Sequence, residues 1–148
     1  MEILIILLGL IIDRITKVWA LKSLAHTDGI VVIKNIFSFS YLENRGAAFG
    51  IFQNKVIALS IVTFIVTVAM IYYLFKYKPS SKLTRISLSL IIGGALGNLI
   101  DRLVYRFVVD FILLHYKDVY EFPTFNVADM LVVCGTILLA ICIIKGDK

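Results

Sequence analysis

Four stretches of this sequence are predominantly apolar, and each is about as long as a membrane-spanning helix. They cover approximately residues 3–22, 56–75, 86–103 and 127–144. A helix needs about 20 apolar residues to cross the roughly 30 Å of hydrocarbon in a bilayer. The pattern therefore predicts an all-α membrane protein, a four-transmembrane-helix bundle with two long connections at 23–54 and 104–126.

The first long connection contains a second kind of pattern. Two short runs, 30–33 and 36–41, are separated by Lys34 and Asn35, and the second run alternates apolar with hydroxyl side chains. A period of two is typical of a strand that buries one face. We therefore expect a small antiparallel β-sheet in this connection, and an outer loop after the third helix.

The composition indicates which solvent surrounds the helices. Hydrophobic residues make up 60% of the chain and charged residues 17%, whereas a soluble domain has about 25% charged residues. A chain of 148 residues cannot bury this excess in its own interior, so lipid must cover much of the surface. The length fits one domain, which we expect to span residues 1–148.

The positions of the basic residues predict the orientation in the membrane. Four of the ten residues 76–85 are basic, and Lys145 and Lys148 follow the last apolar stretch. The connections 23–54 and 104–126 contain four basic residues between them. Because basic residues concentrate on the cytoplasmic side, we expect both termini in the cytoplasm and the sheet on the extracytoplasmic face.

Ionisable residues at membrane depth are the first candidates for chemistry, since an isolated charge there is unfavourable and is usually paired or functional. They are Asp13, Arg14, Lys17, Asp101, Arg102, Asp110 and Asp129. In the predicted orientation, those within the helices fall in the outer halves. The polar ends are therefore expected to converge at the outer membrane boundary.

Several of these residues also have structural explanations. Asp13 and Lys17 lie four apart on one helical face and suit a structural ion pair. Arg102 suits equally a carboxylate partner or a donor to a substrate carbonyl. Asp129, near a helix start, is favoured by the helix dipole whether or not it reacts. Asp110 lies in an apolar run and is the hardest to explain structurally.

Three classes of function compete at this point. An aspartic protease needs two carboxylates, and a zinc site is disfavoured because His26 and His115 lack the H-E-x-x-H spacing. A small transport or proton-relay protein would also carry intramembrane acids, although the inner halves of these helices are uncharged. An assembly subunit would use Gly93 and Gly97 for close helix contact.

Five short motifs occur in order along the chain. They are Asp13-Arg14-Ile15-Thr16-Lys17, Asn44-Arg45-Gly46-Ala47-Ala48-Phe49, the run 93–102, Val108-Val109-Asp110-Phe111 and Phe125-Asn126-Val127-Ala128-Asp129. With these motifs the chain resembles the lipoprotein signal peptidase (signal peptidase II) family of bacterial aspartic membrane proteases along nearly its whole length. It departs from the family pattern at Arg45, where a small polar residue is frequent, and at Gly50, where serine is frequent.

The resemblance implies an aspartic endopeptidase that removes signal peptides from prolipoproteins by cleaving before a diacylglyceryl-modified cysteine. It implies that Asp110 and Asp129 are the catalytic pair. Four residues would bind substrate and three would have structural roles: Asn44, Asn98, Arg102 and Asn126 in the first group, and Asp13, Lys17 and Asp101 in the second.

The same resemblance implies the surroundings of such an enzyme. Its partners would be the diacylglyceryl-modified prolipoprotein and the lipid bilayer, with no nucleic acid, no metal and no cofactor. It would be a monomer that crosses the bacterial cell membrane several times. The active site would open at the outer face.

Overall fold

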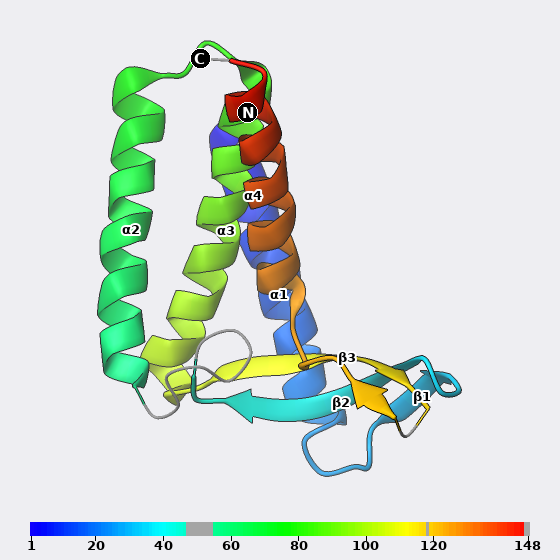
Figure 1. Ribbon diagram of the computed structural model, residues 1–148. Coiled ribbons are helices and arrows are strands. Elements are labelled where there is room, and N and C mark those ends of the chain that lie inside the picture. Colours follow the sequence, from blue (N-terminus) through cyan, green and yellow to red (C-terminus); the bar gives the residue numbers. More distant parts are fainter. Residues whose placement is uncertain (47–54, 118, 147–148) are drawn as a thin grey trace.

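The computed structural model describes residues 1–46, 55–117 and 119–146. These ranges form, in order, α1 (Glu2–Ser23), β1 (Ile30–Ile33), β2 (Phe37–Asn44), α2 (Val56–Tyr77), α3 (Lys82–Tyr105), β3 (Val108–Tyr116), β4 (Tyr120–Glu121) and α4 (Val127–Ile144). The helices lie side by side, and the sheet crosses one end of them (Figure 1). Both termini lie at the opposite end, as the predicted topology requires.

The four predicted helices are confirmed, with ends that differ by a few residues. The largest difference is at α3, which begins at Lys82 because Ser81 caps it by accepting a hydrogen bond from the backbone N–H of Thr84. Helices α2, α3 and α4 are long and apolar enough to cross a membrane. The more polar α1 is not in that group, so its membrane crossing remains a prediction.

Helix α3 is central and packs against α1, α2 and α4. Glycines allow this close approach: a Cβ atom on Gly94 would overlap the backbone oxygen of Ala128 on α4. A Cβ atom on Gly97 would overlap the carboxylate of Asp13 on α1. The packing explanation of Gly97 is therefore confirmed, and the close approach brings the polar end of α3 against both neighbours.

The sheet is antiparallel, with strand order β1-β2-β3-β4. The prediction of a loop after the third helix was wrong, because residues 108–116 and 120–121 form β3 and β4. Residues 108–111 are all buried and apolar apart from Asp110, so the alternation that marks a half-buried strand is absent there. The pairing of Leu42 with Asp110 sets the position of that aspartate on the sheet.

An apolar cluster joins the sheet to the end of α1. Ala20 of α1 and Leu24, which follows the helix, are fully buried against Val109 and Phe111 of β3. The ring of Trp19 packs edge-on against Phe39 of β2, with 5.1 Å between the ring centroids. These contacts therefore fix the position of the sheet along the helices, and this position places Asp110 towards the start of α4.

Candidate active site

One asparagine holds both of the predicted catalytic aspartates. The side-chain Nδ2 of Asn126 donates to Oδ1 of Asp110 over 2.6 Å. The backbone N–H of Asn126 donates to Oδ2 of Asp129 over 3.1 Å. Asp110, on β3, and Asp129, on α4, are thereby brought together from positions that are distant in the sequence.

The start of α4 explains why Asp129 points to this place. Asn126 is the N-cap residue, and its Oδ1 accepts a hydrogen bond of 3.0 Å from the backbone N–H of Asp129. Together with the reverse bond from the Asn126 backbone, this forms a capping box. The structural explanation of Asp129 as a residue suited to a helix start is therefore correct, and it does not compete with a role in the site.

Two further asparagines fix the remaining carboxylate oxygens. Nδ2 of Asn44 donates to Oδ2 of Asp110 over 2.9 Å. Nδ2 of Asn98 donates to Oδ1 of Asp129 over 2.8 Å. Each aspartate therefore receives hydrogen bonds on both oxygens, which restricts the rotation of both carboxyl groups.

A buried charge cluster lies behind these asparagines. The ammonium group of Lys17 lies 2.9 Å from Oδ2 of Asp13 and 3.2 Å from Oδ2 of Asp101. It also donates to Oδ1 of Asn98 over 2.8 Å, so each of its three N–H groups has an acceptor. All three charged side chains are at most 1% exposed. A fully paired cluster avoids the large penalty of an isolated buried charge.

The charge cluster also binds the backbone on either side of the site. Oδ1 of Asp13 accepts from the backbone N–H of Ala128 over 2.9 Å, next to Asp129. Oδ2 of Asp101 accepts from the backbone N–H of Val109 over 3.1 Å, next to Asp110. Each acid of the cluster therefore holds the residue that precedes one of the two candidate catalytic aspartates.

The two aspartates border a single cavity of about 940 Å³. Asn44, Asn98 and Arg102 also line it, together with apolar residues of α4 and of the segment before that helix. Arg102 donates a long hydrogen bond of 3.5 Å to the backbone oxygen of Gly46. The cavity therefore combines acids, amide groups and a guanidinium group with an apolar wall.

Burial makes Asp110 an unusual carboxylic acid. The loss of solvent and the neighbouring charge of Asp129 together raise the pKa of Asp110 to about 7, against the opposing hydrogen bonds from Asn44 and Asn126. A carboxyl group of this kind holds a proton near neutral pH and can act as an acid or hydrogen-bond donor. Within the described ranges, no group of three His, Cys, Asp or Glu side chains could hold a metal ion.

The sequence of the chain decides its family. Residues 5–145 match the sequence profile of signal peptidase (SPase) II. The chain belongs to the signal peptidase II family. It is 60% identical to the lipoprotein signal peptidase of Clostridium novyi over 100% of both chains. It is 62% identical to that of Clostridium tetani, over 99% of this chain and 94% of the other.

A solved structure supports the fold of this signal peptidase II. A bacterial membrane enzyme determined by the in meso method is 35% identical in sequence and superposes with a TM-score of 0.88. The match covers 97% of this chain and 87% of that one. The signal peptidase II resemblance is thus confirmed, and this is a membrane protein with at least three candidate membrane-spanning helices.

The structure brings most of the predicted site residues of this signal peptidase II to the cavity, with one difference. Asp110, Asp129, Asn44, Asn98 and Arg102 line the cavity wall. Asn126, which was expected to bind substrate, is fully buried and does not line the wall. Its short side chain already caps α4 and binds Asp110, so it lies beneath the surface of the cavity.

One partnership was not expected from the sequence. Arg14 of α1 donates from NH1 to Oδ1 of Asp101 over 2.7 Å, and its guanidinium group lies over the ring of Tyr105. Asp101 therefore binds two cations, Arg14 and Lys17. The sequence did contain a signal, because an acid such as Asp101 in an apolar helix needs a cation as its partner. The spacing of residues within one helix does not show which cation of another helix is that partner.

Part of one motif and one departure from the family pattern lie outside the described residues. They are Ala47, Ala48, Phe49 and Gly50. The described part of that motif, Asn44 to Gly46, reaches the active-site cavity through Asn44. Arg45, the other departure, lies on the rim of a different cavity, next to α2.

Proposed function

We propose that this signal peptidase II cleaves prolipoproteins immediately before a diacylglyceryl-modified cysteine, with Asp110 and Asp129 as its catalytic pair. The observation that carries the proposal is that two carboxyl groups, both held by Asn126, border one cavity of about 940 Å³. Membership of an aspartic peptidase family supports the reaction class. The relatives' activity as lipoprotein signal peptidases supports the class of substrate.

In this mechanism the two aspartates share one proton, as closely placed carboxyl groups do. The raised pKa of Asp110 allows it to carry this proton near neutral pH, which leaves Asp129 to act as the base. Asp129 takes a proton from a water molecule, whose oxygen forms a bond to the scissile carbonyl carbon. Asp110 donates a hydrogen bond to the carbonyl oxygen. The C–N bond then breaks, and the proton passes to the departing amine of the cysteine.

The residues around the pair have distinct roles in the proposal. Arg102 stabilises the negative oxygen that develops on the carbonyl group, because a fixed cation in a site of low polarity is most effective there. Asn44 and Asn98 orient the carboxyl groups and contact the peptide from the cavity wall. Asn126 is a positioning residue, since its side chain is buried. Asp13, Lys17 and Asp101 support the site from behind.

The proposed arrangement in the membrane places the acyl chains and the peptide on different sides of the cavity. Met130 and Val133 of α4 line the cavity and are 47% and 56% exposed, so acyl chains can remain in lipid beside them. The peptide approaches from the sheet. In this arrangement α1 spans the membrane with the other helices, both termini are cytoplasmic, and the monomer is the active form.

The test is the cleavage of a diacylglyceryl-modified precursor beside its unlipidated twin. The wild-type protein should cleave the lipidated precursor alone, and Asp110→Asn or Asp129→Asn should each lower the rate by about 1000-fold or more, because one proton-transfer group is lost. Gel mobility and the mass of the products measure the selectivity of the wild type and the cleavage rates of the variants. Near-normal turnover by either folded variant would remove that aspartate from the mechanism, and equal cleavage of the twin would exclude recognition of the lipid.

A further inference from the structure

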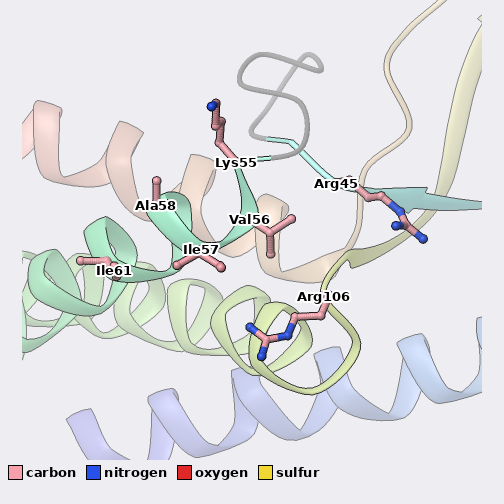
Figure 2. A pocket seen from close by; sticks show the side chains of 7 residues that line it. All are labelled: Arg45, Lys55, Val56, Ile57, Ala58, Ile61 and Arg106. Carbon is pink, nitrogen blue, oxygen red and sulfur yellow. The ribbon is translucent and has the colours of Figure 1, made fainter.

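A second cavity lies beside the start of α2, near the end of α3 and apart from the active site. Its volume is about 580 Å³, and three cations border it: Arg45, Lys55 and Arg106. The remaining wall comes from the first turns of α2 and includes Ile57 and Ile61 (Figure 2). None of its lining residues lines the cavity with the aspartates.

The gathering of cations here stands out against the rest of this end of the molecule. Segments 24–55 and 104–126 contain five basic residues: Lys34, Arg45, Lys55, Arg106 and Lys117. Three of the five border this one cavity, and no acidic residue is among the described residues that line it. The cavity therefore has a positive potential that suits an anion.

The cations differ in how far their charge is already neutralised. Arg45 pairs with Glu43, with 3.0 Å between NH2 and Oε2. Within the described part of the chain, no acidic side chain pairs with Lys55 or Arg106. Figure 2 shows Arg106 and Lys55 on opposite sides of the start of α2, with Lys55 extending outward from the rim on a flexible stem. These two residues are the free cations of the cavity.

Arg106 has a backbone conformation that is unusual for a residue other than glycine. Arg106 follows α3 and has a φ of 66°, in the left-handed region. Glycine is favoured at this position after a helix because a side chain is strained there. An arginine in its place adds a cation to the cavity at the expense of backbone strain.

The start of α2 adds to the attraction for an anion. Its N-cap residue, Lys55, makes no side-chain capping bond, and the first turn contains no acidic residue. The first N–H groups of a helix lack partners within the helix, so they present a partial positive charge. The first residues of α2, Val56, Ile57 and Ala58, line the same cavity as the cations.

The apolar part of the wall identifies the kind of anion. Ile57 and Ile61 lie one turn apart on α2 and are 66% and 54% exposed. Helix α2 is long and apolar enough to cross a membrane, so this exposed face meets acyl chains. Cations above an apolar stripe match a molecule that carries a phosphate above two hydrocarbon chains.

We propose that this cavity binds an anionic phospholipid, with its phosphate on Arg106 and Lys55 and its acyl chains along Ile57 and Ile61. The ligand is a lipid of the surrounding membrane and not the substrate, because a diacylglyceryl group on cysteine carries no phosphate. The inference does not depend on the proposed roles of Asp110 and Asp129. It concerns a second, non-catalytic lipid site on the same molecule.

The experiment titrates the purified protein in neutral detergent with short-chain phosphatidylglycerol and follows the melting temperature. A ligand that binds the folded state raises this temperature in a saturable way. Phosphatidylcholine of equal chain length and inorganic phosphate should give no comparable rise. Arg106→Gly should weaken the apparent affinity for phosphatidylglycerol about tenfold, because a charge-assisted hydrogen bond is lost, and Lys55→Gln should weaken it in the same direction.

Lys117 offers a matched control for Arg106→Gly. It is also a cation with a left-handed backbone, at a φ of 50°, and it does not line the cavity. Lys117→Gly therefore makes the same change in charge and relieves the same kind of strain, and should leave phosphatidylglycerol binding unchanged. Equal losses in both variants, or an undiminished affinity in Arg106→Gly, would overturn the proposal.

Two further results would also overturn it. A rise in melting temperature with inorganic phosphate equal to that with phosphatidylglycerol would identify a simple anion site. A raised KM of Arg106→Gly for the lipidated precursor in neutral detergent, without added phospholipid, would assign the cavity to the substrate. If Arg106→Gly does not fold, Arg106→Gln and Lys55→Gln make the same comparison against Lys117→Gln.

Discussion

At the scale of single residues, Asn126 has the largest number of separate tasks. Its side-chain oxygen caps α4, its side-chain nitrogen binds Asp110, and its backbone nitrogen binds Asp129. A helix cap requires only the oxygen. The side-chain nitrogen is therefore the part that positions Asp110. Substitution by serine keeps an oxygen for the cap and removes this nitrogen, so it separates the two functions.

Asn126→Ser should keep α4 capped but leave Oδ1 of Asp110 without its donor. We expect the rate of precursor cleavage to fall about 100-fold, since misplacement of a catalytic group by a small distance has effects of that size. The control is Ser81→Ala, which removes the cap of α3 at the far end of the molecule. It should lower the free energy of unfolding by about 1 kcal/mol without changing turnover per folded molecule, and the reverse outcome would contradict the assignment.

The raised pKa of Asp110 predicts how stability changes with pH. The folded-state pKa is about 7, and an unfolded aspartate titrates near 3.9. Because the folded state binds the proton more tightly, the free energy of unfolding should decrease as pH rises between these values, by on the order of 1 kcal/mol per pH unit. Above about pH 7 this contribution should no longer change.

Melting temperatures in detergent between about pH 5 and 9 measure this dependence. Asp110→Asn cannot titrate, so the variant should lose this part of the slope and be the more stable protein above neutral pH. An identical slope in the variant and the wild type would show that another group is responsible. The cleavage rate of the wild type should also fall as pH rises through about 7, because the pair loses its shared proton.

At the scale of elements, the charge cluster of Asp13, Lys17 and Asp101 joins four parts of the chain. It lies on α1 and α3, and its acids accept backbone hydrogen bonds from β3 and from the first turn of α4. The hydrogen bond from Lys17 to Asn98 connects the cluster to the active site. The cluster therefore couples the position of each proposed catalytic aspartate to the helix packing.

Asp101→Asn should be strongly destabilising, because it leaves Lys17 and Arg14 with a single acid between them. Removing one partner of a buried ion pair costs about 3–5 kcal/mol. The melting temperature in detergent should fall more than the activity per folded molecule. A variant with unchanged stability and no activity would show that Asp101 acts in the reaction itself.

A surface ion pair provides the comparison for this variant. Glu2 and Arg85 lie 3.2 Å apart, with side chains that are 18% and 36% exposed. Glu2→Gln removes one charge from a partly exposed pair, so the free energy of unfolding should change by about 1 kcal/mol or less. A loss as large as that of Asp101→Asn would mean that burial is not what makes the cluster important.

At the scale of the whole molecule, the sheet lies at one end of the helices and the chain termini lie at the other (Figure 1). Asp13, Asp101 and Asp129 belong to three different helices. Asp101 accepts a hydrogen bond from Val109 of β3, and Lys17 joins Asp101 to Asp13. Asn126 joins Asp129 to Asp110 of the same strand. This distribution fits a site at one membrane boundary. A proton relay would instead need acids along the whole thickness of the bilayer.

The orientation can be tested by labelling intact cells with a membrane-impermeant thiol reagent, in a variant that lacks Cys134 and Cys142. Asp28→Cys, between α1 and the sheet, should be labelled from outside. Lys78→Cys, at the opposite end after α2, should react only after the membrane is opened. Both native side chains are exposed, so burial does not explain a difference. The opposite result would invert the proposed topology.

The sequence by itself determined the helices and the candidate acids of this protein. Twenty residues in a row without a charge, as in 56–75, have few alternatives to a membrane helix, and an aspartate in such surroundings needs a partner or a function. The motifs around Asp110 and Asp129 then indicated the reaction. These are properties of short segments, so a linear pattern is sufficient to reveal them.

The tertiary structure decided which residues meet. Residues 108–116 have no strand alternation, and they became β3 because they pair with β2 and pack on α1. The partnership of Arg14 with Asp101 joins residues 87 positions apart, and the burial of Asn126 follows from its contacts with both aspartates. These outcomes depend on distances between separate elements, which no local pattern contains.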